Sequence, residues 1–168
     1  MSSNLPDRND PPGELPKIFI ALGANISSSA GAPEATLKAA IAALRLRGVQ
    51  VLEVSSFHQT PAWPDPSDPP FTNAVARIET ALQPLALLEL LHEVETDFGR
   101  KRSAHNAPRT LDLDLIDYGG RVETGRVQLP HPRMAGRGFV LGPLAEIAPG
   151  WVHPVTGAPI GRLLAALS

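Results

Sequence analysis

The alternating stretch Leu-Asp-Leu-Asp-Leu at residues 111–115 constrains the fold of this chain more than any other feature, because its period is two. In a β-strand, successive side chains point to opposite faces of the sheet. Leu111, Leu113 and Leu115 are therefore predicted to face a core, and Asp112 and Asp114 to share the other face. The alternation predicts a half-buried strand over residues 111–118.

Helices are indicated where apolar residues recur at spacings of three and four. Pro33 begins one such segment, Leu37, Ile41 and Leu44 form its apolar stripe, and Gly48 ends it. By the same signals, the remaining elements are expected as strands at residues 17–22, 49–57, 71–80 and 122–129 and as helices at residues 84–98, 140–147 and 160–167.

Residues 58–70 are predicted to be a stiff loop without regular structure, because they contain five prolines that lack an N–H donor. The elements then follow the order β-α-β-β-α-β, which predicts an α+β fold: a ferredoxin-like antiparallel sheet with helices packed on it, an α/β sandwich. A single domain is expected over residues 17–168. The polar, proline-rich residues 1–16 are expected to be a disordered tail.

The overall composition excludes several classes of partner. A net charge of −2 gives no general attraction to nucleic acid or to an anionic membrane, so an anionic ligand needs a local basic cluster. No apolar run is long enough to span a bilayer, and no cysteine is present for disulfides or thiolate metal sites. The expectation is a cytoplasmic protein that binds neither nucleic acid nor membrane.

Asp112 and Asp114 form a possible metal site. The rise of two residues along the strand places their carboxylates about 6–7 Å apart, and the tips of the side chains can converge on a pair of cations about 3.5–4 Å apart. Carboxylate oxygens suit Mg²⁺, which proteins usually hold with one or two carboxylates plus substrate phosphates. Taken alone, the pair equally fits the solvated face of a strand, although aspartate is disfavoured in strands.

A basic segment directly before this strand favours a phosphate ligand. Residues 99–110 contain no acidic side chain, and their basic residues are Arg100, Lys101, Arg102, His105 and Arg109. Positive charge beside a carboxylate pair suits a magnesium polyphosphate, which needs metal on one side and guanidinium groups on the other. A solvated basic loop is the alternative. No P-loop or dinucleotide-binding glycine motif is present, so side chains would have to hold the phosphates.

Seven short motifs together resemble one known family. They are Phe19-Ile-Ala-Leu-Gly-Ala-Asn25, Ser55-Ser-Phe-His-Gln-Thr-Pro61, Phe71-Thr-Asn73, Gly99-Arg-Lys-Arg102, Pro108-Arg-Thr-Leu-Asp-Leu-Asp114, Leu129-Pro-His131 and Arg137-Gly-Phe139. In this order they closely resemble the 6-hydroxymethyl-7,8-dihydropterin pyrophosphokinases of folate biosynthesis. The resemblance covers residues 17–167, and the motif at residues 108–114 is its most specific part.

The resemblance implies a role for individual residues. Asp112 and Asp114 match the family's ligands for two Mg²⁺ ions and, with Arg100 and Arg109, are the expected catalytic residues. The positions that match ATP-binding residues are Arg100, Arg102, Arg109, His131 and Arg137. The positions that match the pterin pocket are Thr60, Pro61, Phe71, Asn73 and Phe139, with the two phenylalanines sandwiching the ring. Taken one by one, Phe71 and Phe139 fit core packing, and His131 and Asn73 fit ordinary structural roles.

The reaction implied by the resemblance is transfer of pyrophosphate from ATP to the pterin alcohol, with release of AMP, by a monomer. The best candidate for a general base is Asp112. One departure is Asn106-Ala107, which stands where the family often has Trp-Gly and so removes an aromatic side chain that could cover the bound pterin and ATP. A non-catalytic relative that binds pterin or nucleotide is the alternative function. A D-x-D nucleotide-sugar transferase is a weaker one, because the chain is short.

Overall fold

The computed structural model describes residues 15–62, 65–100 and 110–168. Two of the helices begin with a proline in the first turn, as expected, and a glycine with positive φ follows each of them, at Gly48 and Gly99. The elements in chain order are β1 (Ile18–Ala24), α1 (Pro33–Leu46), β2 (Gln50–Val54), β3 (His58–Thr60), β4 (Phe71–Glu79), α2 (Pro84–Asp97), β5 (Asp112–Tyr118), the 3-10 turn η1 (Met134–Gly136), α3 (Gly138–Ile147) and α4 (Ile160–Ala165).

The strands form one five-stranded sheet whose main order is β2-β4-β1-β5, with β3 also paired to β4. Every pairing is antiparallel. Consecutive strands that are not neighbours are joined by α1 and α2, so the predicted ferredoxin-like arrangement of an α/β sandwich is confirmed. β1 and β4 lie at the centre, and β5 is the outer strand beside β1.

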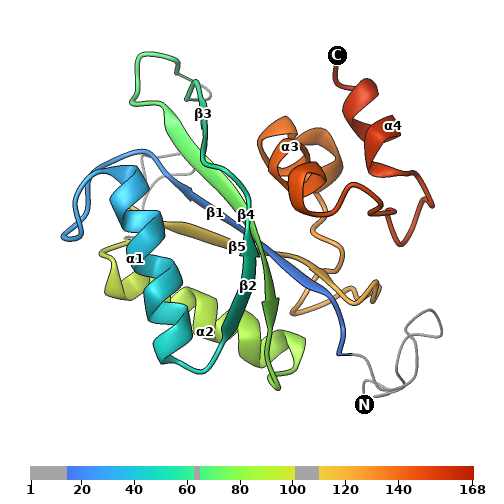
Figure 1. The fold of residues 1–168 in the computed structure, drawn as a ribbon, viewed down its shortest axis with the longest axis horizontal. Coiled ribbons are helices and arrows are strands. Elements are labelled where there is room, and N and C mark those ends of the chain that lie inside the picture. The colour runs from blue at the N-terminus through green and yellow to red at the C-terminus, as the bar shows by residue number, and fades with distance from the viewer. Residues whose placement is uncertain (1–14, 63–64, 101–109) are drawn as a thin grey trace.

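One face of the sheet is covered by α1 and α2 (Figure 1). Alternate residues of the central strands β1 and β4 point into this main core, as the period of two predicts, and β2 and β5 contribute further residues on either side of a register shift. Leu111, Leu113 and Leu115 are all buried there, which confirms the face predicted for them. The helices contribute Leu37 and Leu44 from α1, and residues such as Leu87 and Leu91 from α2.

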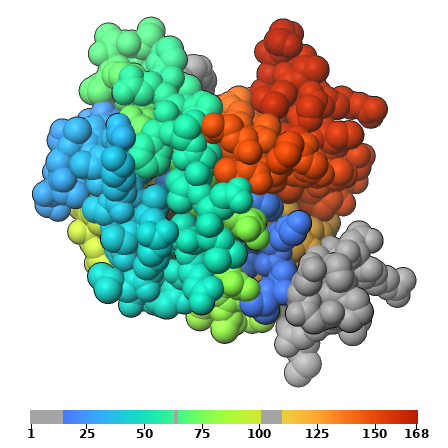
Figure 2. All heavy atoms as spheres, viewed as in Figure 1, coloured from blue at the N-terminus to red at the C-terminus, as the bar shows by residue number. Residues whose placement is uncertain are grey.

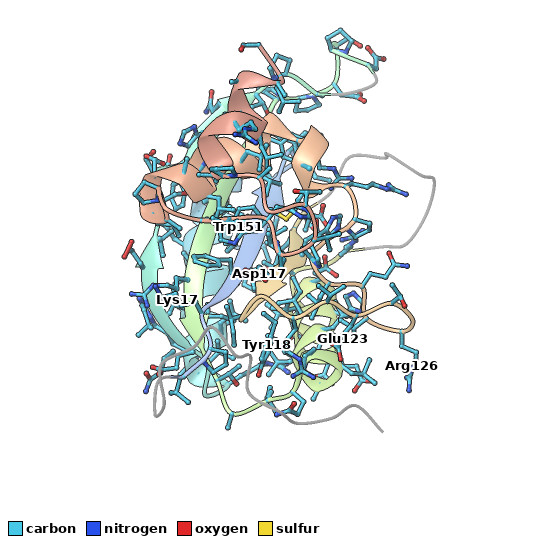
Figure 3. The ribbon with its side chains drawn as sticks, turned by 90° about the vertical axis from the view of Figure 1, so that its right-hand side faces the viewer. Lys17, Asp117, Tyr118, Glu123, Arg126 and Trp151 are labelled. Carbon is cyan, nitrogen blue, oxygen red and sulfur yellow. The ribbon has the colours of Figure 1, made fainter. Side chains whose placement is uncertain are left out.

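The opposite face is covered over only part of its area by α3, α4 and the segment between them (Figures 1 and 2). Phe19, Val75 and Ile116 pack there against α3 in a second, smaller core. Trp151 ties this layer to β5, because its Nε1 donates to Asp117 Oδ2 at 2.9 Å (Figure 3). The remainder of this face carries the polar strand residues described below.

The prediction of an irregular loop over residues 58–70 is wrong for its first three residues. His58–Thr60 form β3, and they pair with Asn73, Thr72 and Phe71 of β4. The prolines begin only at Pro61, so the preceding residues keep the N–H groups that a strand requires.

The strand predicted at residues 122–129 is also absent from the described residues. Glu123 and Leu129 instead exchange two backbone hydrogen bonds across an isolated bridge. Gly125 adopts a φ of 134° within this loop, a value that L-residues rarely reach, and the chain folds back on itself there. The apolar residues of this stretch therefore belong to a loop closed by the Glu123–Leu129 bridge and not to a further strand of the sheet.

Candidate functional site

The site begins with a row of residues that crosses three neighbouring strands. Gly23 of β1 lies opposite Asn73 of β4 on one side and opposite Asp112 of β5 on the other. Residues directly opposite each other point to the same face of an antiparallel sheet. Because neighbouring strands are about 4.8 Å apart, the Cα atoms of Asn73 and Asp112 are about 10 Å apart. An amide and a carboxylate thus face the same side of the sheet, with a glycine between them.

Gly23 has no side chain at the point where one would separate these two groups. A Cβ atom built there would lie 2.9 Å from Asn73 Oδ1. Asn73 is only 6% exposed, and its Nδ2 donates to Thr60 Oγ1 at 3.0 Å, so it has little room to move. The glycine therefore keeps a gap in the sheet surface between the amide of β4 and the carboxylates of β5.

The next row places Asp114 opposite Ala21, on the same face as Asp112. Both aspartates are half-buried and line a cavity of about 460 Å³ beside β5. The cavity lies between α2 and the segment that precedes α3. Its other lining residues are Leu88, His92, Glu95, Arg100, Leu113, Leu115, Val127, Gln128, His131, Pro132, Arg133 and Arg137.

Arg100 supplies positive charge directly to the carboxylates. Its Nη1 donates to Asp112 Oδ1 at 2.6 Å and also to Glu95 Oε2, and the arginine side chain is 18% exposed. An ionised donor and acceptor in a partly buried place make the strongest kind of protein hydrogen bond. A cation bound at Asp112 would compete with this guanidinium, which is then available to a phosphate.

Glu95 is a site residue that the sequence reasoning missed. Its side chain is buried, and Oε2 accepts from Leu113 N at 2.9 Å as well as from Arg100. Burial raises the pKa of Glu95 to about 7, against the lowering effects of the Leu113 N–H and of Arg100. A signal was present, because Glu95 follows Leu87 and Leu91 at spacings of four on the apolar stripe of α2.

His131 lines the same cavity as a neutral group. Burial, aided by the positive charges of Arg137 and Arg133, lowers its pKa to about 4. Nδ1 accepts from Arg133 N at 3.2 Å, which places the proton of the neutral ring on Nε2. His131 N donates to Ile116 O, so β5 holds this segment in place. At neutral pH, His131 can donate one hydrogen bond to a ligand but brings no charge.

The five residues matched to a pterin pocket lie along the same face of the sheet or beside it. Phe71 and Asn73 lie at alternate positions of β4 and point to the same face of the sheet as Val75. Thr60, the partner of Asn73, ends β3, and Pro61 follows it. Phe139 is the second residue of α3, is 39% exposed, and stacks on Arg137 with 5.5 Å between the guanidinium carbon and the ring centroid.

The structure therefore brings together Asp112, Asp114, Arg100, His131 and Arg137 in one cavity. The pterin-matched residues do not line that cavity; they adjoin it through Gly23 and through the Arg137–Phe139 stack. Arg102, Arg109 and the Asn106 departure lie outside the described residues.

The donor set of the cavity fits a metal ion that is shared with phosphates. Among the side chains in residues 15–62, 65–100 and 110–168, no group of three or more His, Cys, Asp or Glu is placed to hold a metal by itself. Two carboxylates facing one cavity are, however, what a protein typically contributes to Mg²⁺ that is also bound by substrate phosphates.

No described helix is long and apolar enough to cross a membrane.

Comparison with known proteins supports one family. The model of the 7,8-dihydro-6-hydroxymethylpterin-pyrophosphokinase family matches residues 19–149. A 2-amino-4-hydroxy-6-hydroxymethyldihydropteridine pyrophosphokinase of Synechocystis is 42% identical, over 92% of this chain and 78% of the relative. The enzyme of the same name from Pseudomonas aeruginosa is 36% identical, over 90% of this chain and 92% of the relative. A folic acid synthesis protein of Pneumocystis carinii is 34% identical over 85% of this chain, which spans 19% of that longer protein.

The match covers β1 to α3, and hence both the carboxylate cavity and the strands that carry the polar row. The resemblance inferred from the seven motifs is confirmed. The chain belongs to the 7,8-dihydro-6-hydroxymethylpterin-pyrophosphokinase family.

Proposed function

We propose that this chain transfers pyrophosphate from ATP to the hydroxymethyl group of 6-hydroxymethyl-7,8-dihydropterin in folate biosynthesis, giving AMP and the pterin diphosphate. The observation that carries the proposal is that two half-buried aspartates line the same cavity as Arg100, His131 and Arg137. Family membership supplies the substrates, since the relatives carry the name of this pyrophosphokinase. No observation favours a non-catalytic relative.

Asp112 and Asp114 are proposed to hold two Mg²⁺ ions together with the phosphates of ATP. Magnesium bound there would neutralise the phosphate oxygens and polarise the bond that breaks. Arg100 would donate to a phosphate oxygen in place of Asp112, while its bond to Glu95 keeps the guanidinium at the cavity wall. His131 is proposed to donate a hydrogen bond from Nε2 to ATP, and Arg137 to add positive charge beside the phosphates. Arg102 and Arg109 are proposed as further phosphate ligands.

The pterin is proposed to lie over the Asn73–Gly23 row. Asn73 would read the polar edge of the ring, Phe71 and Phe139 would contact its two faces, and the Thr60–Pro61 backbone would complete the pocket. The gap at Gly23 leads from this place toward Asp112, so the hydroxymethyl arm can point at the phosphates.

In the proposed reaction, the hydroxymethyl oxygen forms a bond to the β-phosphorus while the bond from that phosphorus to the AMP oxygen breaks. The hydroxyl proton is lost, with Asp112 as the nearest proposed acceptor. The protein mainly positions the reactants and balances the charge that develops on the phosphate oxygens. Arg100, which follows α2, and Arg137, which precedes α3, both supply positive charge to the cavity.

Product analysis tests the proposal directly. Incubation with ATP, Mg²⁺ and the dihydropterin should yield AMP and pterin diphosphate in equal amounts, and omission of the pterin or addition of EDTA should abolish both. Formation of ADP, or of no product by folded protein, would refute it.

We also propose that the protein is a cytoplasmic monomer. The absence of cysteine is compatible with the cytoplasm, and light scattering tests the monomer.

A further inference from the structure

A three-residue polar cluster joins β3 to α3, outside the cavity described above. Ser56 Oγ donates to both oxygens of Glu146, at 2.6 and 3.0 Å. His58 Nε2 lies 2.9 Å from Glu146 Oε2 and 3.1 Å from Ser56 Oγ. A carboxylate only accepts hydrogen bonds, so the serine and the histidine both donate to it. We call Ser56, His58 and Glu146 the β3–α3 clasp.

The clasp is not arranged for nucleophilic catalysis. In a catalytic triad, the histidine takes the serine proton on one ring nitrogen and faces the carboxylate with the other. Here Nε2 of His58 faces both partners, and the serine proton is already directed to Glu146. The carboxylate stays charged, because the hydrogen bonds from Ser56 and His58 lower the pKa of Glu146. The clasp is therefore a charge-assisted link between β3 and α3.

The clasp connects two elements that carry residues of the proposed pterin pocket. His58 is the first residue of β3 and lies opposite Asn73, and Thr60 at the other end of β3 accepts from Asn73 Nδ2. Glu146 lies in the last turn of α3, the helix whose second residue is Phe139. One end of the link is thus attached to the Asn73 side of the pterin pocket, and the other to the helix that carries Phe139.

Among the described residues, the apolar contacts of α3 are made with β1, β4 and β5 and not with β3. Its buried residues Val140, Leu141 and Leu144 pack on the second core, with Phe19, Val75 and Ile116. Apolar packing is non-directional, so it permits small shifts of a short helix along the sheet. Hydrogen bonds from two donors, Ser56 and His58, to one carboxylate are directional and restrict such shifts. Side chains 37% and 39% exposed contribute little to stability, so the clasp is better suited to orientation.

We propose that Glu146 is a positioning residue that holds α3 against β3 and thereby sets the distance between Phe139 and Asn73 across the pterin pocket. This rests on the placement of the pterin proposed above. Glu146 does not line the ATP cavity and is not among the residues proposed to contact the pterin, so its removal should weaken pterin binding through geometry and leave that cavity unchanged.

Steady-state kinetics of Glu146→Ala and Glu146→Gln test the proposal. The alanine variant should raise KM for the pterin up to about fivefold, the most that a half-exposed ion pair allows, with KM for ATP unchanged. Glu146→Gln should lie between, because its amide oxygen still accepts from Ser56 without the negative charge. His58→Ala added to Glu146→Ala should cause little further change, since both act through one link.

Glu34→Ala is the matched control. Glu34 belongs to an exposed ion pair with Lys38 on α1, on the other face of the sheet, and its loss should leave both KM values unchanged. An unchanged pterin KM in Glu146→Ala would overturn the proposal. So would equal rises in both KM values accompanied by a large fall in Tm, because that pattern indicates general destabilisation.

Asn73→Ala separates failure of the clasp from failure of the pocket. If Asn73→Ala raises the pterin KM and Glu146→Ala does not, the pocket stands and the clasp is wrong. If Asn73→Ala also leaves the pterin KM unchanged, the placement of the pterin is wrong, and the clasp proposal falls with it.

Discussion

The face of the sheet that α3 packs against is divided into two halves with opposite chemistry, although the same three strands build both. In the covered half, Phe19, Val75 and Ile116 are almost completely buried. In the open half, the corresponding strand positions carry Gly23, Asn73 and the carboxylates of β5. A side chain under the helix layer must be apolar or fully paired, whereas the open end can keep polar groups for a ligand.

Three aspartates of β5 show the same contrast within one strand. Asp112 and Asp114 line the cavity, whereas Asp117 is 5% exposed under the helix layer. Asp117 accepts from Trp151 Nε1 with one oxygen and from Gly120 N with the other, and burial raises its pKa. Figure 3 shows Trp151 and Asp117 next to each other. What covers each residue decides whether it holds the fold together or faces the ligand.

The largest effect is expected from Asp114→Asn, which tests the open half. Turnover should fall by about 10³-fold, because loss of a metal ligand removes several kcal/mol of charge stabilisation. The fold should be unaffected, since the amide has nearly the same size and the position is half-buried. AMP release at saturating Mg²⁺ and a thermal melt measure the two quantities. A near-parental turnover would remove Asp114 from the catalytic residues.

The same substitution in the covered half should have the opposite result. Asp117→Asn replaces one accepting oxygen with an NH₂ group, so either Trp151 Nε1 or Gly120 N loses its acceptor. We expect a loss of about 1–3 kcal/mol in the free energy of unfolding, with turnover per folded molecule retained. Urea unfolding followed by tryptophan fluorescence gives the first value. If Asp117→Asn reduced turnover and not stability, the division of the face would be wrong.

A smaller effect is expected from Gly23→Ala, in the Asn73–Gly23 row of the open half. Gly23→Ala places a Cβ atom 2.9 Å from Asn73 Oδ1, and Asn73 can yield only by weakening its bond to Thr60. KM for the pterin should rise about tenfold, which corresponds to about 1.4 kcal/mol.

Gly142→Ala is the control for this change, because a Cβ at that position of α3 meets nothing within 4 Å. It should leave the pterin KM unchanged. If Gly23→Ala behaved like Gly142→Ala, the close approach of glycine and amide would have no functional role.

Local patterns in the sequence account for much of this result. The alternation at residues 111–115 correctly predicted a strand with two aspartates on one face, and spacings of three and four predicted α1 and α2 within two residues of their ends. These signals are local because the periods of a strand and a helix are properties of consecutive residues. The ordered motifs identified the family, which the comparisons confirm.

Contacts between distant parts of the chain were decided only by the tertiary structure. Glu95 reaches Leu113 across 18 positions, and Ser56 reaches Glu146 across 90. No periodicity records such pairs, since each depends on how α2 and α3 pack on the sheet. For the same reason, the sequence determined that Asp112 and Asp114 share a polar face, but only the register shift between β1 and β5 and the position of Trp151 placed Asp117 beneath the helix layer. A side chain's role depends on the layer above it, and packing at long range sets that layer.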